Sequence, residues 1–286
     1  MTKILIIGVS GMLGSTAYRF FASSKGFRVT GTARSLHEIA ALPQHDHATI
    51  VGGIDATDID SIIGVIGTEK PDVVINCVGV IKQLASSKSS LTSISINSLF
   101  PHRLAQLCAA SNARLIQIST DCVFAGDKGN YKESDSPDAH DLYGRSKLLG
   151  EVDYPHAITL RTSIIGHELG RAVSLIDWFL SQPGPQVSGY HRAIYSGFPT
   201  IELVRIIRDL VIPRPELHGL WHVASAPINK FDLLTLVKDV YGKTIEIVPD
   251  DSVVIDRSLD GSRFNAATGY AVPPWQDLIT RMHAAR

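Results

Sequence analysis

Three side chains in one stretch of the chain, Thr120, Tyr143 and Lys147, are of types that together can move a proton. Tyr143 and Lys147 stand four residues apart, which on a helix places both side chains on one face, one turn apart. An ammonium beside a phenol stabilises the phenolate and lowers a pKa that is about 10 when unperturbed. We therefore expect Tyr143 to act as a proton donor with a lowered pKa. The alternative is a half-buried tyrosine that a solvated lysine covers.

The elements around these residues must bring them together. Leu115, Ile116 and Ile118 form an apolar run that predicts a strand over residues 114–120. Thr120 would then lie at the carboxyl end of a strand, where open α/β sheets place their ligands. The segment 121–141 is long for a loop without regular structure, and such loops are often functional or mobile.

A glycine-rich turn at the N-terminus is the strongest local signal in the sequence. An apolar run ends at Gly8, and G-V-S-G-M-L-G precedes a helical pattern. Gly8 allows a tight turn, Gly11 lets the backbone approach a pyrophosphate, and Gly14 lets helix and strand pack closely. The alternative is an ordinary glycine-rich turn. The residues expected to contact a dinucleotide here are Gly8, Ser10, Gly11, Met12, Leu13 and Gly14.

With these motifs the sequence resembles the extended short-chain dehydrogenase/reductases, and among them the dTDP-4-dehydrorhamnose reductase family. S-T-D-C-V-F-A-G from Ser119, Y-K-E-S-D-S-P from Tyr131 and Y-G-R-S-K-L-L-G-E from Tyr143 carry the likeness. It is specific over residues 1–165 and weaker but continuous to the end. The spacing G-x-x-G-x-x-G is also that of the short-chain reductases.

The resemblance implies an NADP-dependent oxidoreductase that reduces the 4-keto group of a nucleotide-linked 4-keto-6-deoxy sugar, in deoxysugar and polysaccharide precursor biosynthesis. Tyr143 would be the general acid, Lys147 would hold the nicotinamide ribose, and Thr120 would hydrogen-bond the carbonyl oxygen. A nucleotide-diphosphate sugar is the expected partner, and the resemblance allows a homodimer. The remaining residues that the family pattern places at the cofactor are Asp55, Ala56, Cys77, Val78, Gly79 and Ser119.

The end of the second predicted strand, 28–32, bears on the choice of cofactor. An acid about 20 positions past the glycines would take the ribose 2′-hydroxyl of NAD. The corresponding residues here are Thr-Ala-Arg-Ser, without a carboxylate, and Arg34 can pair with a 2′-phosphate. We expect NADPH, with NADH as the alternative cofactor. The alternative for Arg34 is an ordinary surface arginine without a cofactor contact.

Strand and helix patterns alternate from residue 3 to residue 161, which predicts an α/β fold with a Rossmann-type, doubly wound parallel sheet. We expect an NAD(P)-binding domain at 1–165 and a substrate-binding lobe at 166–286, with segments near 195–225 returning to the first domain. A long helix is predicted from Leu91 to Ser111, which Pro101 should kink or divide. The resemblance implies that Asn97 orders water near Lys147, and the alternative is a polar residue that satisfies the kink. Asp58 is expected to cap a helix.

Composition narrows the functional classes. The chain has 286 residues, 44% hydrophobic, with 27 basic and 28 acidic side chains, so nothing suggests a nucleic-acid or membrane surface. Its three cysteines are odd in number and scattered, which is typical of reduced thiols in the cytoplasm. We expect no signal peptide, because the apolar run Ile4–Ile7 is too short for one. We also expect no metal, because Ser15 and Thr16 occupy the turn where some members of the family carry a metal-binding acid.

Two other functions compete. A sugar-nucleotide dehydratase or epimerase with tightly bound NAD would fit the fold, but dehydratases carry Asp-Glu after the threonine, whereas Asp121 is followed here by Cys122. A non-catalytic dinucleotide-binding regulatory protein is the second alternative, although such proteins often lose one member of the triad. Cys122 also replaces the usual aromatic and alters the pocket wall. Candidate contacts for the diphosphate and base are Arg161, Arg192, Arg257, Arg263, Trp178 and Tyr190.

Overall fold

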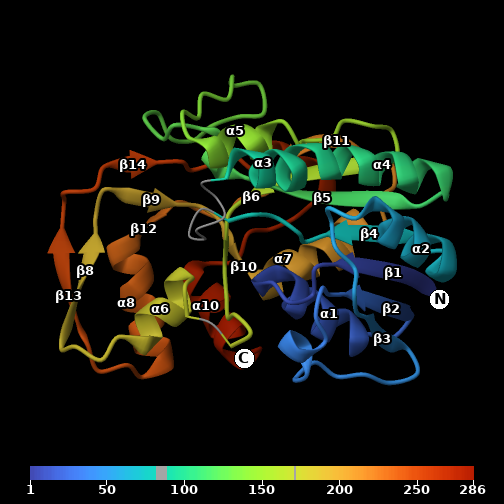
Figure 1. Cartoon of the computed structure of the whole chain (residues 1–286). Coiled ribbons are helices and arrows are strands. Elements are labelled where there is room, and N and C mark those ends of the chain that lie inside the picture. Colours follow the sequence, from blue (N-terminus) through green and yellow to red (C-terminus); the bar gives the residue numbers. More distant parts are fainter. Residues whose placement is uncertain (82–88, 171) are drawn as a thin grey trace.

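A computed structural model describes residues 1–81, 89–170 and 172–286. Within this part of the chain, the centre is a seven-stranded sheet in the order β11-β6-β5-β4-β1-β2-β3, and every neighbouring pair is parallel (Figure 1). The strand order reverses between β1 and β4, and open α/β sheets bind ligands at such a switch point. The strands are β1 Thr2–Ile7, β2 Phe27–Thr32, β3 Ala48–Val51, β4 Val73–Asn76, β5 Arg114–Thr120, β6 Ala157–Thr162 and β11 Gly219–His222.

Helices cover both faces of the sheet because alternate residues of its strands point to opposite sides. In β1, Ile4 and Ile6 pack in one apolar cluster with α1, α7 and α10, whereas Leu5 and Ile7 pack in another with α2 and α4. This confirms the predicted doubly wound α/β fold. The helices are α1 Met12–Ala22, α2 Ile59–Glu69, α4 Phe100–Ala110, α5 Leu142–Leu148, α7 Thr200–Ile206 and α10 Trp275–Ala284. Asp58 caps α2 as predicted, accepting hydrogen bonds from the backbone N–H groups of Asp60 and Ser61.

The predicted helix over residues 91–111 is divided, as its proline suggested. α3, Ser90–Ser93, leads into a π-helical stretch, Ile94–Leu99, and then into α4. Pro101 lies in the first turn of α4 and has no N–H to donate, and the wider π turn accommodates this missing bond. Asn97 lies on the π-helical stretch, where its side chain is buried.

The C-terminal half builds a smaller lobe and also contributes to the main sheet. β11 pairs with β6 from Gly219 opposite Ile158 to His222 opposite Arg161, and α7 packs on α1. Away from the sheet, at the left of Figure 1, β8 runs parallel to β13 and α8 packs against them. The remaining elements are β7 Ile164–Ile165, β8 Gln186–Tyr190, β9 Ala193–Tyr195, β10 Phe198–Pro199, β12 Ile228–Asn229, β13 Glu246–Asp250, β14 Ile255–Asp256, α6 Leu175–Ser181, α8 Lys230–Tyr241 and α9 Ser262–Thr268.

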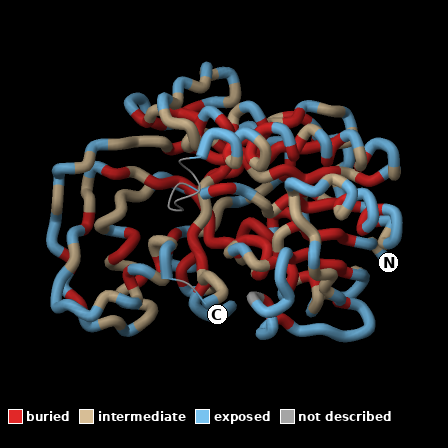
Figure 2. Tube along the Cα trace, in the orientation of Figure 1, coloured by how far each residue is buried: buried red, intermediate tan, exposed pale blue. Residues whose placement is uncertain are grey.

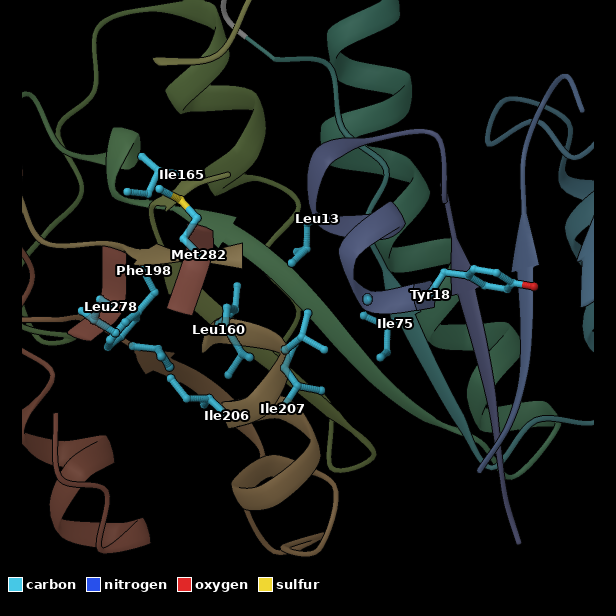
Figure 3. Packing of buried hydrophobic residues seen from close by; sticks show 14 of the residues in the cluster. Leu13, Tyr18, Ile75, Leu160, Ile165, Phe198, Ile206, Ile207, Leu278 and Met282 are labelled. Carbon is cyan, nitrogen blue, oxygen red and sulfur yellow. The ribbon is translucent and has the colours of Figure 1, made fainter. Parts of the chain in front are cut away.

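The apolar core joins the two halves of the chain. Figure 2 shows that the buried residues concentrate in the sheet and in the helices against it. In Figure 3, Leu13 of α1 and Leu160 of β6 belong to the same packed cluster as Ile206, Phe198 and Leu278 from the C-terminal half. Among the described residues, no helix combines the length and the apolar character needed to cross a membrane.

Candidate active site

A cavity of about 1000 Å³ opens at the carboxyl ends of the parallel strands. The residues of the N-terminal half that line it include Ser10, Gly11, Met12, Leu13, Arg34, Cys77, Val78, Gly79, Ser119, Thr120, Tyr143 and Lys147. The C-terminal lobe contributes Ile194, Tyr195, Lys230, Ile255 and Arg257. The structure therefore brings the glycine turn and the three candidate catalytic side chains to one cavity, between the two halves of the chain.

The glycine turn between β1 and α1 has the geometry that a phosphate group needs. Gly8 has a φ of +91°, and a Cβ there would lie 2.7 Å from Val78. A Cβ on Gly14 would overlap the carbonyl oxygen of Gly8, so these two glycines hold the turn against the helix without lining the cavity. No side chain caps the start of α1, and its first turn carries no acid. The free N–H groups and the helix dipole thus favour an anion at Gly11.

Arg34 lies at the same end of the cavity, beyond β2. Its exposed side chain lines the cavity, as a 2′-phosphate contact would require. Asp55 and Ala56 do not line it. Asp55 instead accepts hydrogen bonds from the backbone N–H and the hydroxyl of Thr57 at 2.8 and 2.7 Å, and its pKa is lowered by these bonds and by the charge of Arg34.

Thr120 ends β5 and is held by its neighbours. Its hydroxyl accepts a hydrogen bond from the Cys122 N–H at 3.1 Å and donates to Asp121 Oδ1 at 3.1 Å. Asp121 is buried, and burial raises its pKa, against the lowering effect of hydrogen bonds that include one with Ser163. A threonine hydroxyl has one proton. Thr120 therefore cannot donate to a substrate oxygen while it donates to Asp121.

The expected lowering of the Tyr143 pKa is wrong for this structure. Burial raises the pKa of Tyr143 well above its usual value, and the nearby Cys122, Asp121 and Asp141 raise it further. A hydrogen bond with the Thr120 hydroxyl acts in the opposite direction but is outweighed. Tyr143 therefore keeps its proton at neutral pH, as a proton donor must.

Lys147 is buried, at 8% exposure, whereas Tyr143 one turn earlier is half-buried. Its ammonium donates a hydrogen bond to the Ile118 carbonyl oxygen at 2.6 Å, which aims it at the end of β5. Burial lowers the pKa of Lys147 to about 8, although the charge of Glu151 raises it. A lysine with this pKa changes its charge close to neutral pH.

Close packing fixes the helix that carries Tyr143 and Lys147. Asn97 accepts a hydrogen bond from the Val80 N–H at 2.9 Å and donates to the Val80 carbonyl and to Ser146, both at 3.1 Å. It thereby ties α5 to the strand-end segment after β4, a role that neither sequence-based alternative described. Cβ atoms at Gly144 and Gly150 would overlap the carbonyl oxygens of Cys122 and Asn97, so both glycines allow the close approach.

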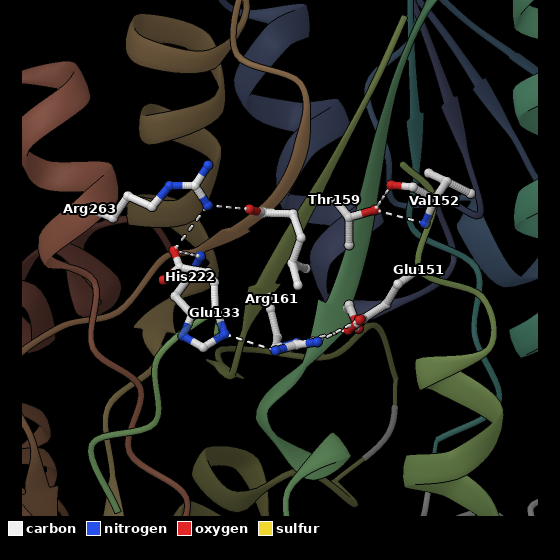
Figure 4. Close-up of polar contacts among 9 residues, drawn as sticks. Glu133, Glu151, Val152, Thr159, Arg161, His222 and Arg263 are labelled. Carbon is white, nitrogen blue, oxygen red and sulfur yellow. Dashed lines mark hydrogen bonds and ion pairs between the residues drawn. The ribbon is translucent and has the colours of Figure 1, made fainter. Parts of the chain in front are cut away.

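Figure 4 shows a network of polar contacts around the buried Arg161. Arg161 of β6 is 1% exposed and donates to Glu151 from Nε at 2.9 Å and from Nη2 at 2.6 Å. Its Nη1 lies 2.9 Å from His222 Nε2, and His222 Nδ1 lies 3.0 Å from the Tyr131 carbonyl oxygen. Because a guanidinium only donates, Nε2 accepts and the proton resides on Nδ1. Burial and the Arg161 charge lower the pKa of His222 to about 4.

Of the four arginines considered for a diphosphate, one lines the cavity. Arg257 does, and its Nε donates to the Phe124 carbonyl oxygen at 2.8 Å. Arg161 is committed to Glu151, Arg263 stacks on Trp221 at 3.8 Å, and Arg192 is exposed outside the cavity. Trp178 and Tyr190 do not line it either.

Sequence patterns missed several cavity residues, among them the charged residues Lys230 and Asp121. Lys230 begins α8 and lines the cavity. Burial lowers the pKa of Lys230, and the charge of Asp121 opposes this shift only in part. The sequence pattern gave Asp121 no role of its own, yet its carboxyl group interacts with the charges of Lys230 and Arg257. No motif surrounds Lys230, so no local signal could have marked it. Cys122 lines the wall, and burial raises the pKa of its thiol to about 12.

In the described residues, no three His, Cys, Asp or Glu side chains are placed to hold a metal ion. The three cysteines, Cys77, Cys108 and Cys122, are free thiols.

A doubly wound sheet with a glycine turn on β1 and a Tyr-x-x-x-Lys helix beside a strand-end threonine defines the class of short-chain dehydrogenase/reductases. Residues 1–284 match the family model described as the RmlD substrate binding domain, and the chain belongs to this family. The curated relatives include a dTDP-4-dehydrorhamnose reductase of Aggregatibacter actinomycetemcomitans, 25% identical over 314 residues, which cover 99% of each chain.

Two further comparisons agree with this family. A probable low-salt glycan biosynthesis reductase of Haloferax volcanii is 30% identical over 308 residues, covering 98% of this chain and 97% of that protein. The crystal structure of a dTDP-4-dehydrorhamnose reductase from Bacillus anthracis in complex with NADP superposes with a TM-score of 0.81 over 99% of both chains, at 19% identity. The last similarity shows the shared fold.

Proposed function

We propose that the chain uses NADPH to reduce the 4-keto group of a nucleotide-linked 4-keto-6-deoxy sugar, in the biosynthesis of a deoxysugar or glycan precursor. The observation that carries the proposal is the convergence of Tyr143, Lys147 and Thr120 in one cavity with the glycine turn. The named activities of the relatives support the same reaction class. NADPH, when bound, supplies a hydride for the carbonyl carbon.

The residues present fit this cofactor. The uncapped first turn of α1, which follows Gly11, would offer its N–H groups to a pyrophosphate, and the Gly14 position has no room for a side chain. Arg34 would hold the 2′-phosphate, and Cys77–Gly79 and Ser119 line the cavity where the ribose would lie. The preference for NADPH over NADH follows from the Arg34 charge, since a carboxylate at this position would repel a phosphate.

The protein's part in the reaction is to orient the carbonyl and to supply a proton. Tyr143 carries a proton at neutral pH and would donate it from Oη to the oxygen that develops negative charge. Lys147, as an ammonium, would stabilise the phenolate that remains. Thr120 would turn its proton from Asp121 towards the same oxygen, which is easier when Asp121 is itself protonated.

The substrate's diphosphate would lie against Lys230 and Arg257. These two cations come from the C-terminal lobe and line the same cavity as Tyr143. We therefore assign dinucleotide binding to residues 1–165 and sugar-nucleotide binding to residues 166–286, with β11 and α7 returning to the sheet. Free thiols support a cytoplasmic location. We also propose a homodimer, which the resemblance to the family allows.

The test is NADPH oxidation with a panel of dTDP-, UDP- and GDP-linked 4-keto-6-deoxyhexoses. Tyr143→Phe should bind NADPH as the wild type does and turn over about 10²–10⁴-fold more slowly. Tyr154→Phe is the matched control, because the Tyr154 hydroxyl contacts His102 and does not line the cavity. If the wild type binds NADPH but reduces none of the panel, the proposal fails in favour of a non-catalytic dinucleotide-binding protein. NAD retained through purification would instead favour an epimerase or dehydratase.

A further inference from the structure

The carboxylate of Glu151 lies across the carboxyl ends of two neighbouring strands. Its Oε1 accepts hydrogen bonds from the Ser119 hydroxyl at 2.6 Å and from Arg161 Nε at 2.9 Å, and its Oε2 accepts from Arg161 Nη2 at 2.6 Å. Ser119 and Arg161 are register partners on β5 and β6. The Glu151 side chain is 11% exposed. These hydrogen bonds hold the Glu151 carboxylate beside the end of β5, which carries Thr120.

Lys147 and Glu151 bond to adjacent residues at the end of β5: the Lys147 ammonium donates to the Ile118 carbonyl oxygen, and Glu151 accepts from the Ser119 hydroxyl. α5 ends at Leu148, and two further backbone bonds, from the Gly150 N–H to the Lys147 carbonyl and from the Glu151 N–H to the Leu148 carbonyl, turn the chain back towards the strands. Glu151 is the charged group that raises the pKa of Lys147 against burial. A buried ammonium without such a charge loses its proton more easily.

The other titratable groups around the cavity do not supply that charge. Burial raises the pKa of Tyr143, and it raises those of the Cys77 and Cys122 thiols to about 12, so all three are neutral at pH 7. Asp121, which follows β5, is hydrogen-bonded to Thr120 and lies near the cations of the C-terminal lobe. Arg161 of β6 pairs with Glu151 from the other side, with 2.6 Å between Nη2 and Oε2.

We propose that Glu151 is a positioning residue, which keeps Lys147 an ammonium in the cavity and, through Ser119, fixes the strand end that bears Thr120. Its consequence for turnover rests on the proposed function, but its effect on Lys147 does not. Arg161 supports Glu151 in this role, because its guanidinium balances the Glu151 charge and does not line the cavity.

The test is an NMR titration of the side-chain nitrogen of Lys147 in the ¹⁵N-lysine-labelled full chain, with its signal assigned by its loss in Lys147→Arg. In Glu151→Gln the titration midpoint of Lys147 should fall by about one pH unit. Glu151→Asp should restore most of it, because the charge returns. Asp153→Asn, which removes an exposed carboxylate two residues further on, should leave the midpoint unchanged. Equal midpoints in the wild type and Glu151→Gln would overturn the inference.

Glu151→Gln also leaves the buried Arg161 without a counter-charge, which can prevent folding. The same titration is therefore run on Glu151→Gln/Arg161→Met, which removes both charges. The Lys147 midpoint should again lie below that of the wild type, and an unchanged midpoint in this variant would also overturn the inference.

The titration requires no substrate, so its result does not depend on whether the proposed function is correct. A wild type that reduces no sugar nucleotide, together with a lowered midpoint in Glu151→Gln, would refute the reductase and leave the role of Glu151 in place. Where reduction is observed, the alkaline limb of kcat/KM should move to lower pH in Glu151→Gln and stay in place in Asp153→Asn. A purely structural loss would lower kcat/KM at every pH without moving this limb.

Discussion

Replacing His222 with glutamine should remove part of the protein's loss of stability in acid. His222 is fully buried between Arg161 and the Tyr131 carbonyl oxygen, and its pKa falls from 6.5 to about 4. Below pH 6.5 the His222 imidazole takes up a proton in the unfolded chain but stays neutral in the folded chain. The free energy of unfolding therefore declines as the pH drops towards 4. At pH 5 the two pKa values give a loss of about 2 kcal/mol relative to neutral pH.

The assay is urea unfolding at about pH 7.5 and about pH 5, with His222→Gln beside the wild type. A glutamine amide can accept from Arg161 and donate to the Tyr131 carbonyl without titrating. Between the two pH values the wild type should lose about 2 kcal/mol more than the variant. His218→Gln is the control, because His218 is exposed four residues earlier. Equal losses in the wild type and His222→Gln would refute the assignment of a neutral, buried His222.

Two further substitutions test the cofactor end of the cavity and the support of α5. Arg34→Ala should weaken NADPH binding about 10- to 100-fold and leave NADH binding nearly unchanged, as measured by fluorescence titration, whereas Arg28→Ala should alter neither; equal weakening of both cofactors would contradict a 2′-phosphate contact. Gly150→Ala should lower the free energy of unfolding by about 1–3 kcal/mol, because its Cβ overlaps the Asn97 carbonyl oxygen. Gly64→Ala, with open space around it in α2, should instead be neutral or stabilising, and the same result for both glycines would contradict the packing argument.

Local patterns were enough to predict most of the sheet. The bounds of β5, Arg114–Thr120, are those expected, because an apolar run between turn-forming segments has few other ways to bury itself. The cap at Asp58 and the division of the helix near Pro101 were also predictable, since each depends on the chemistry of one residue and its neighbours. Register and pairing with β11 depend on residues far along the chain.

The sequence could indicate that Thr120, Tyr143 and Lys147 come together, but not their protonation. Spacing indicated that Tyr143 and Lys147 share a helix face, yet it could not show how deeply both would be buried. Burial decides the direction of both pKa shifts, and it comes from the packing of the whole fold. The same limit applies to Lys230, which reaches the cavity only because α8 begins beside it.

The pairing of β11 with β6 has a consequence for how the protein is made. When a ribosome has released the first six strands, β6 is still the open border of the sheet, and Arg161 on it has no His222 beside it. An uncovered strand border is a template for wrong pairing, and the segment that closes it is synthesised only after α6 and α7. A nascent chain halted before Gly219 should therefore bind chaperones more readily than one released past His222.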